Sequence, residues 1–230
     1  MMSWSMPKSN NPIVESLNKC NKSKRDAFIK DYLSHGVSRF SFVQIGAQLA
    51  GVDSFRKDIL NNPKWEGILV EPLPKCFKEL VNSYKNRPGL KFENAAMAPK
   101  NDIFTFYISP RKTVSTLSKE LLVKVKEEIR VEGITWSKLL KKHKYDFIDL
   151  VHIDAEGSDC KIVCDILGSD NPPVFIEFEV NRLTSDEEAK DTFLKLEKRG
   201  YTLFHRSEKG GWFDCLAVGL NRVNRERNAS

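Results

Sequence analysis

The sequence is poor in cysteine and histidine and contains no long hydrophobic run. Its five cysteines are scattered and odd in number, which excludes the disulfide framework of a small secreted protein. Cys160 and Cys164 stand one helical turn apart, but no second Cys or His pair completes a zinc site, so buried thiols explain them better. No stretch approaches the ~20 apolar residues of a membrane-spanning helix, and the N-terminus lacks the apolar core of a secretory signal. We therefore expect a cytoplasmic protein without a membrane span.

The composition is that of a folded domain. Hydrophobic residues make up 40% of the 230 residues and charged residues 30%, a balance that a disordered chain does not have. The length suits one well-filled α/β domain rather than two. The net charge of +6 is spread over the whole chain and is only a weak indication of a nucleic-acid partner.

The chain divides into three parts. We expect residues 1–38 to form an N-terminal arm and helix, residues 39–220 the main domain, and residues 221–230 a basic tail. In the main domain short apolar runs alternate with helical patterns, which predicts a mostly parallel sheet with helices on both faces. The last two apolar runs, 201–205 and 212–218, predict an antiparallel terminal hairpin.

The first strand of the predicted sheet ends in a turn that contains a glycine. Gly46 lies within the run 44–51, where this glycine and the small residues at 47 and 50 let the backbone turn tightly and approach a ligand. A phosphate loop is excluded because Val52 and Asp53 stand where Lys and Ser or Thr are required. The dinucleotide pattern fails because Gln48 replaces its second glycine. The loop alone is explained equally well by a tight turn between strand and helix.

A glutamate ends the second strand of the predicted sheet. Glu71 follows four apolar residues and precedes Pro72. A carboxylate in this place can accept hydrogen bonds from both hydroxyls of a ribose, although it could also be a surface residue that merely ends a strand. A ribose-binding acid without the pyrophosphate glycines favours an adenosine that carries no phosphates. S-adenosylmethionine fits this description better than NAD.

Small residues follow the third strand of the predicted sheet. The strand predicted over residues 90–92 leads through Glu93 to Asn94 and Ala95, and small side chains there would suit a wall for adenine. Small residues also end strands for reasons of packing alone.

The segment from 152 to 159 concentrates ionisable residues where a strand turns into a helix. Asp154 stands at the strand tip, and we interpret it as the group that acts as a base or binds a metal. His152 is more simply explained as a half-buried, hydrogen-bonded histidine. Asp159, and by the same reasoning Glu156, would cap the next helix, an explanation that we accept for Asp159.

Two further polar residues belong to the next strand and its end. Glu177 follows an apolar run, and Asn181 comes after the strand. Together with Asp154 they would form an oxygen-rich site for Mg²⁺ or Mn²⁺. The alternative is that acids at strand ends orient the cofactor or the substrate.

These segments, in this order, resemble the FkbM-like S-adenosylmethionine-dependent methyltransferases. The matching runs are residues 42–47, 67–72, 94–96, 135–140, 148–159, 176–177 and 200–201, within a region of about residues 39–219. The resemblance implies a seven-stranded Rossmann-like methyltransferase sheet with a reversed last strand. It also implies methyl transfer from S-adenosylmethionine to a hydroxyl of a sugar, a glycan or a related small molecule.

The resemblance also implies a set of site residues. Gly46 would hold the methionine end of the cofactor and Glu71 its ribose. The predicted cofactor-binding residues are Gln44, Gly46, Ala47, Gln48, Glu71, Asn94, Ala95, Asp154 and Glu156; the catalytic candidates are Asp154, His152 and Glu177; the possible metal ligands are Asp154, Glu177 and Asn181. One departure from the family pattern is that Gln48, Leu49 and Ala50 intervene before Gly51, where the family has Asn followed closely by glycine.

Two other functions remain open. A nucleotide-dependent oxidoreductase would share this fold class, but the pyrophosphate glycines are missing. A non-catalytic module that binds nucleic acid or protein would draw on the net charge, the tail and two basic helices predicted near 119–130 and 138–144. Glutamates interrupt the first of these, so a solvated helix face explains it better. The polar loops 109–118 and 181–186 suit a hydroxylated or anionic acceptor without identifying it.

Overall fold

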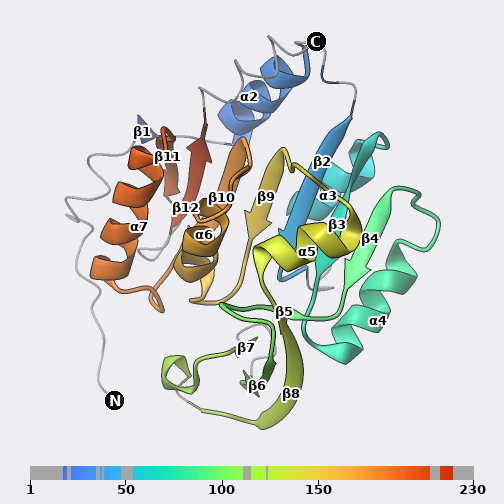
Figure 1. Ribbon diagram of the computed structural model, residues 1–230, viewed down its shortest axis with the longest axis vertical. Helices are drawn as coiled ribbons and strands as arrows, with labels where there is room; N and C mark the ends of the chain where they lie inside the picture. The colour runs from blue at the N-terminus through green and yellow to red at the C-terminus, as the bar shows by residue number, and fades with distance from the viewer. Residues whose placement is uncertain are drawn as a thin grey trace.

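Seven strands of one sheet, joined by a short eighth strand at the edge, form the centre of the molecule (Figure 1). The computed structural model describes residues 18–19, 22–34, 37, 39–47, 54–110, 115–122, 124–207 and 213–219. The strand order is β1-β11-β12-β10-β9-β2-β3-β4. The strands are β1 (Asn18–Lys19), β2 (Phe40–Ile45), β3 (Trp65–Val70), β4 (Leu90–Glu93), β9 (Leu150–Ile153), β10 (Phe175–Val180), β11 (Thr202–Ser207) and β12 (Phe213–Val218).

The sheet is parallel except around β12. Strand β12 lies between β10 and β11 and is antiparallel to both, whereas the neighbours from β10 to β4 all run parallel. The mostly parallel sheet with a reversed last strand is therefore confirmed, and of the strands in this sheet the sequence analysis missed only β1. The strand order reverses at β2, because the chain passes to β3 and β4 on one side and later to β9 and β10 on the other. Ligands of such sheets bind beside this point.

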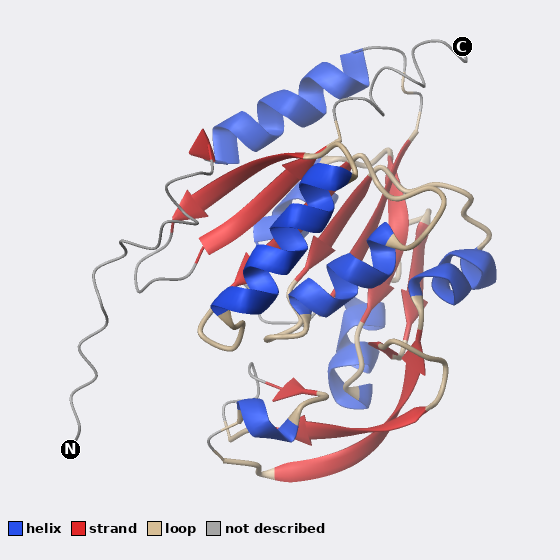
Figure 2. Cartoon of the chain, turned by 60° about the vertical axis from the view of Figure 1, so that its left-hand side comes forward, coloured by secondary structure: helices blue, strands red, loops and turns tan. Residues whose placement is uncertain are grey.

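Helices cover both faces, as predicted (Figure 2). Helices α5 (Trp136–His143), α6 (Asp159–Leu167) and α7 (Asp186–Lys198) cover one face, and α2 (Lys22–Ser34), α3 (Ser54–Asn61) and α4 (Pro74–Ser83) cover the other. All six residues of β2 are buried, with Val43 and Ile45 facing the first group and Phe40 and Phe42 the second. None of the helices in the described part of the chain is long and apolar enough to span a bilayer.

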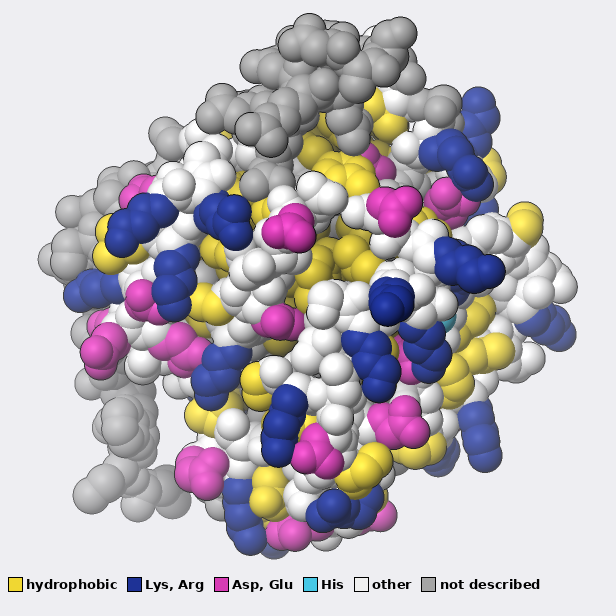
Figure 3. Space-filling view, viewed as in Figure 1, with side chains coloured by type: hydrophobic (Ala, Val, Ile, Leu, Met, Phe, Trp, Pro, Cys, Tyr) yellow, Lys and Arg dark blue, Asp and Glu magenta, His cyan; other side chains and the backbone are white. Residues whose placement is uncertain are grey.

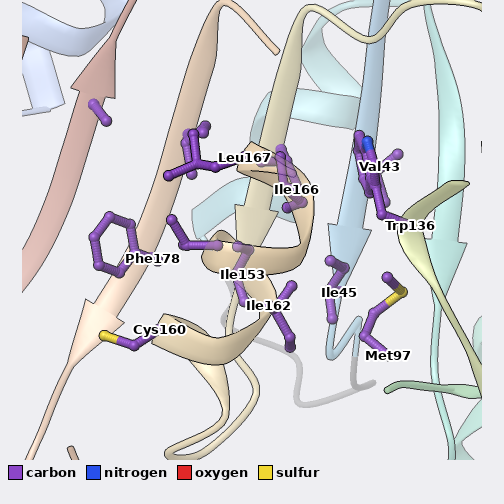
Figure 4. Packing of buried hydrophobic residues seen from close by; sticks show 14 of the residues in the cluster. Val43, Ile45, Met97, Trp136, Ile153, Cys160, Ile162, Ile166, Leu167 and Phe178 are labelled. Atoms are coloured by element: carbon purple, nitrogen blue, oxygen red, sulfur yellow. The ribbon is translucent and has the colours of Figure 1, made fainter. Parts of the chain in front are cut away.

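The α5–α7 face holds the larger apolar core. Figure 4 shows Ile162 and Ile166 of α6 packed over the strands that carry Ile153 and Ile45. Trp136, at the start of α5, lies in the same core and is 1% exposed. This packing fixes the start of α6, and with it the loop that connects β9 to α6.

A second, smaller sheet lies beyond the carboxyl ends of the main sheet (Figures 1 and 2). Its strands are β5 (Ala96–Met97), β6 (Ile103–Ile108), β7 (Ser115–Thr116) and β8 (Glu127–Ile134), in the order β5-β8-β6-β7. The prediction of a basic helix near residues 119–130 is wrong. That segment holds a 3₁₀ turn over Lys119–Leu121, and β8 begins at Glu127.

The side chains of β8 explain why the segment is a strand. Val131 is buried and Ile129 partly buried in a small apolar cluster that includes Phe106, while Arg130 and Glu132 between and beyond them are exposed. Buried and exposed side chains thus alternate residue by residue, and this alternation favours a strand although glutamate and lysine are good helix formers. The small sheet thereby presents an apolar face to the main sheet.

Candidate active site

A cavity lies at the carboxyl ends of β2, β3 and β9, beside the reversal of strand order. Its walls come from the ends of β2 and β3 (residues 45–46 and 70–73), residues 95–97, and the loop after β9 (residues 154–156 and 158). Phe106, Ser115 and Leu117, from the small sheet and the turn after it, and Ile162 complete the described lining. The small sheet thus closes the cavity from the side opposite the main sheet.

Gly46 forms the tight turn at the end of β2. Its φ of 76° lies in the left-handed region, and a Cβ built there would stand 1.9 Å from the carbonyl oxygen of Asp154. The backbone nitrogen atoms of Gly46 and Ala47 both donate to Val70 O, at 3.0 and 3.1 Å. Only glycine fits this backbone, which draws the ends of three strands together.

Glu71 is built into the wall of the cavity and is 1% exposed. Its Oε1 atom accepts a hydrogen bond from the backbone nitrogen of Leu73 at 2.9 Å, but its Oε2 atom has no hydrogen-bond partner among the described residues. Burial, with a further contribution from Asp154, raises the pKa of Glu71 to about 7. A buried acceptor without a donor is costly, so this atom is prepared for a donor that a ligand brings.

Asn94 and Ala95 play different parts at the end of β4. The Asn94 amide donates to the carbonyl oxygen atoms of Glu71 and Pro72, at 2.8 and 3.1 Å, and so holds the turn that carries Glu71. Ala95, followed by Ala96 and Met97, lines the cavity with apolar surface. The structure therefore places Ala95 at the predicted site and Asn94 behind it.

The loop after β9 supplies two further carboxylates to the cavity. Asp154 is exposed and Glu156 half-buried, and both line the cavity. Glu156 has a φ of 48°, which is unusual for a side chain with a Cβ and marks a strained loop. Burial first, and then the charges of Asp154, Glu179 and Asp159, raise the pKa of Glu156 to about 8, while Arg182 acts in the opposite direction.

The buried side chain of Asp159 holds this loop in place by hydrogen bonds to its backbone. It is fully buried and accepts hydrogen bonds from the backbone nitrogen atoms of Ala155, Gly157 and Glu179, at 3.2 to 3.4 Å. Burial raises the pKa of Asp159 to about 7. Asp159 lies in the first turn of α6, where a negative charge is favoured. Its hydrogen bonds, however, go to the loop before α6 and to β10, so the expected capping of α6 by this side chain is not seen.

The structure places His152 and Glu177 elsewhere than expected. Their side chains point to the α2–α4 face, where the ring of His152 stacks on Phe55 of α3 with centroids 4.6 Å apart. His152 Nδ1 lies 3.3 Å from Glu177 Oε2, and Arg25 of α2 forms ion pairs with Glu177, at 3.2 Å, and with Asp58 of α3. Neither His152 nor Glu177 is among the described residues that line the cavity.

The charge of Glu177 is fixed by these partners. Burial alone would raise its pKa, but His152 and Arg25 outweigh burial and lower the pKa to about 2. A carboxylate held in this way is a poor proton acceptor and is not free to bind a metal. Gln44 is buried on the same strand face, directly across from His152 in the register of β2 and β9.

The predicted Mg²⁺ or Mn²⁺ site is not supported. No group of three or more His, Cys, Asp or Glu side chains in the described ranges could hold a metal ion. The Asn181 amide donates to Glu179 at 2.6 Å, and its oxygen accepts from the backbone nitrogen of Leu183 at 2.8 Å. Because side chains alternate along β10, Glu177 shares the face of Phe175 and is separated from Asp154 by the sheet.

The sequence analysis missed the contribution of the small sheet to the site. Phe106 and Leu117 line the cavity, and the alternating pattern of β8 was the signal that a sheet stands there. Gln48, Arg111 and Lys112, which the analysis placed near the cofactor or the acceptor, lie outside the described residues. Ser115 of the same loop does line the cavity.

A second cavity adjoins the first. The two share Met97, Leu117, Ser158 and Ile162 in their walls, and the second has a volume of about 580 Å³. Its lining combines apolar side chains with Ser118 and Lys161. The first cavity is much smaller, about 50 Å³, so most of the open volume of the two lies in the second.

Basic side chains gather elsewhere on the surface. They are prominent around α5 in Figure 3, where Lys138, Lys141 and Lys142 are exposed. None of these three lysines lines either cavity. The first of the two predicted basic helices does not exist, since a 3₁₀ turn and β8 occupy its place.

The strand order with its reversed β12, and a cavity at the switch point with a buried acid at the end of β3, are those of the Rossmann-like methyltransferase fold. The chain belongs to the FkbM methyltransferase family: the family model described as "Methyltransferase FkbM domain" matches residues 44–203, well over half of the chain. The resemblance seen in the sequence is thereby confirmed. A comparison with curated proteins gives no match.

One solved structure supports the same fold, and two others are similar at lower scores. A crystal structure of methyltransferase FkbM from Methylobacillus flagellatus KT matches with a TM-score of 0.50 and 14% identity, over 80% of this chain and 45% of that one. The METTL16 MTase domain matches with a TM-score of 0.49 and 12% identity, over 85% and 66%. A Methanococcus jannaschii fibrillarin pre-rRNA processing protein matches with a TM-score of 0.46 and 12% identity, over 79% of this chain and 66% of that one. The chain thus spans less than half of the FkbM structure and about two thirds of the other two.

Proposed function

We propose that this chain transfers the methyl group of S-adenosylmethionine to a hydroxyl group of a sugar, a glycan or a related small molecule. The observation that carries the proposal is Glu71, which lines the cavity and whose buried Oε2 atom has no partner among the described residues. The two adjacent hydroxyls of a ribose would donate to such a carboxylate in a charge-assisted pair. The hydroxyl acceptor follows from the family resemblance.

The side chains that line the rest of the cavity suit the chemistry of an adenosine that lacks phosphates. Ala95, Ala96 and Met97 offer an apolar wall next to Glu71, and Phe106 faces the cavity from the small sheet. The turn at Gly46 exposes backbone where a side chain would otherwise block the approach of a ligand. S-adenosylmethionine, when bound, supplies an electrophilic methyl group on a positively charged sulfur.

The protein then has to orient an acceptor and receive its proton, because a hydroxyl is a weak nucleophile. Asp154 and Glu156 are the carboxylates of the β9 loop that line the cavity, and we assign them this role in place of His152 and Glu177. The raised pKa of Glu156, about 8, is close to the value at which a base works best near neutral pH. Arg25, Glu177 and His152 would act as a support for the ends of β9 and β10.

Two broader expectations remain part of the proposal. The described cysteines are free thiols, which fits a reducing compartment, and we place the protein in the cytoplasm. We also treat residues 39–220 as the methyltransferase unit, with residues 1–38 and 221–230 outside it.

Calorimetric titration tests the proposal directly. The wild-type protein is titrated with S-adenosylmethionine, S-adenosylhomocysteine and NAD. We expect saturable binding of the first two and none of NAD. The variant Glu71→Ala should bind about tenfold more weakly or worse, since each hydrogen bond to a charged group contributes about 1.5–3 kcal/mol.

Glu66→Ala is the matched control, because Glu66 lies on the same strand but pairs with the exposed Arg39 at 2.8 Å. Binding that is indifferent to Glu71, or tighter for NAD, would contradict the proposal. After positive binding, a panel of hydroxylated acceptors identifies the substrate by the methyl product.

A further inference from the structure

Hydrogen bonds hold every polar atom of Glu71 except one. Its backbone nitrogen donates to Glu93 O at 3.0 Å, and its carbonyl oxygen accepts from the Asn94 amide at 2.8 Å. Its side-chain atom Oε1 accepts from the backbone nitrogen of Leu73 at 2.9 Å. The exception is Oε2, which has no hydrogen-bond partner among the described residues. The turn after β3 and the end of β4 together therefore set the place of Oε2.

Asn94 makes the side-chain contribution to this arrangement. An amide nitrogen has two hydrogen atoms to donate, and that of Asn94 donates to Pro72 O at 3.1 Å as well as to Glu71 O. One side chain thus joins two consecutive carbonyl groups of the neighbouring strand end. The register of β3 and β4 ends with Val70 opposite Glu93, so Asn94 extends the connection between the two strands to the turn that carries Glu71.

The residue before Asn94 is itself held firmly. Glu93 is 4% exposed, and its two carboxylate oxygen atoms lie 2.8 Å from Lys142 Nζ and 2.8 Å from His143 Nε2, at the end of α5. Helix α5 is packed into the larger apolar core. The end of β4 is therefore a supported platform from which Asn94 can fix the turn after β3.

We propose that Asn94 is a positioning residue that holds Glu71 in place to bind the ribose, and that it thereby makes the site selective for ligands with ribose hydroxyls. The inference rests on the proposed function. Asn94 is not among the described residues that line the cavity, so it acts through Glu71. A hydrogen bond weakens steeply as its geometry departs from the optimum, and a misplacement of about 1 Å at a binding group is enough to lose much of its effect.

Asn62 provides a matched control. Its amide also donates to a backbone carbonyl, that of Asp58 at 2.7 Å, and it is half-buried like Asn94. Asn62 precedes β3 whereas Glu71 follows it, so Asn62 lies at the end of the strand away from the cavity. Asn62→Ala therefore removes the same kind of hydrogen bond without touching the turn of Glu71.

The test compares two ligands by calorimetry of the full chain. The probes are S-adenosylhomocysteine and its counterpart that lacks both ribose hydroxyls. Burial raises the pKa of Glu71 to about 7, so a buffer at about pH 8.5 keeps its carboxylate ionised. We expect the wild type to bind S-adenosylhomocysteine about tenfold more tightly than the counterpart. Asn94→Ala should reduce this ratio to about twofold, and Asn62→Ala should keep the wild-type ratio.

A double-mutant cycle shows whether Asn94 acts through Glu71. In the wild-type background Asn94→Ala should weaken the binding of S-adenosylhomocysteine about fivefold. In the background of Glu71→Ala the same change should weaken it by less than about twofold, because the group that Asn94 positions is already absent. A merely structural role of Asn94 would give equal effects in the two backgrounds, and that result would overturn the inference.

Asn94→Asp is a second variant that keeps the size of the side chain and, when ionised, removes both donors. It should lower the ratio in the same direction, so the test stands even if Asn94→Ala does not fold. An unchanged ratio in a folded Asn94 variant would overturn the inference and leave the proposed function standing. A wild type that binds no S-adenosylhomocysteine, or that does not prefer the ligand with ribose hydroxyls, would overturn the proposed function and the inference with it.

Discussion

Gly46 and Asp154 are in backbone contact across the cavity end of the sheet. A Cβ on Gly46 would stand 1.9 Å from the carbonyl oxygen of Asp154 and 2.9 Å from its carbonyl carbon. Asp154 itself is tied to β2, because its backbone nitrogen donates to Ile45 O at 3.0 Å. The turn that we propose to contact the cofactor and the strand tip that carries a proposed base are thus held together by backbone contacts.

Gly46→Ala should therefore abolish cofactor binding. Two effects act together: the positive φ of 76° disfavours alanine, and the added methyl group collides with backbone that cannot rotate away. We expect no measurable binding of S-adenosylmethionine by calorimetry. Gly168→Ala is the control, since Gly168 at the end of α6 has a φ of −71° and a Cβ there meets nothing closer than 3.2 Å. Undiminished binding by Gly46→Ala would show that the ligand lies elsewhere.

The sequence allowed Gly46 and Glu71 to be predicted because their signals are local. A glycine after an apolar strand and an acid before a proline indicate position by themselves. The function of Glu177 depends instead on Arg25, which lies 152 residues earlier in the chain. No pattern near Glu177 shows that an arginine of α2 reaches it, so the sequence analysis assigned a structural ion pair to catalysis and to a metal site.

The region 118–134 shows a second reason why a prediction from the sequence failed. Its many lysines and glutamates favour a helix, and only the pairing of β8 with β6 makes the alternation decisive. Long-range pairing outweighs local propensity in such segments. The same pairing brings Phe106 to the cavity, which explains why that wall of the site escaped prediction.

Arg25→Met should destabilise the fold strongly. Arg25 is 6% exposed and links α2 to α3 through Asp58 and to β10 through Glu177. Removal of the cation leaves buried carboxylates without their partner, which typically costs about 3–5 kcal/mol. The free energy of unfolding in urea, followed by circular dichroism, measures the loss.

Lys119→Met is the control for Arg25→Met. Lys119 pairs with Glu128 at 3.2 Å, but both side chains are about half exposed. Exposed pairs of this kind contribute about 0–1 kcal/mol to stability. The free energy of unfolding of the control should therefore be close to that of the wild type. Equal unfolding free energies for the two variants would show that Arg25 does not hold the helices to the sheet.

Glu71→Gln should change how stability depends on pH in the ligand-free protein. The pKa of Glu71 rises from its ordinary 4.5 to about 7 on folding, so between these values the folded state holds a proton that the unfolded chain has released. The free energy of unfolding therefore falls as pH rises from about 5 to about 7. Glu156 and Asp159 act in the same direction, whereas Glu177, with its lowered pKa, matters only below about pH 4.5.

The variant should flatten this slope without abolishing it, because one of three contributing carboxyls is removed. One proton corresponds to at most about 1.4 kcal/mol per pH unit, so the slope should decrease by no more than that amount. Urea unfolding at several values between about pH 5 and about pH 7 measures it. Glu132→Gln, an exposed glutamate of β8, should retain the wild-type slope. Identical slopes for Glu71→Gln and the wild type would mean that Glu71 is already ionised in the folded protein, and that the cavity reaches water more freely than its burial indicates.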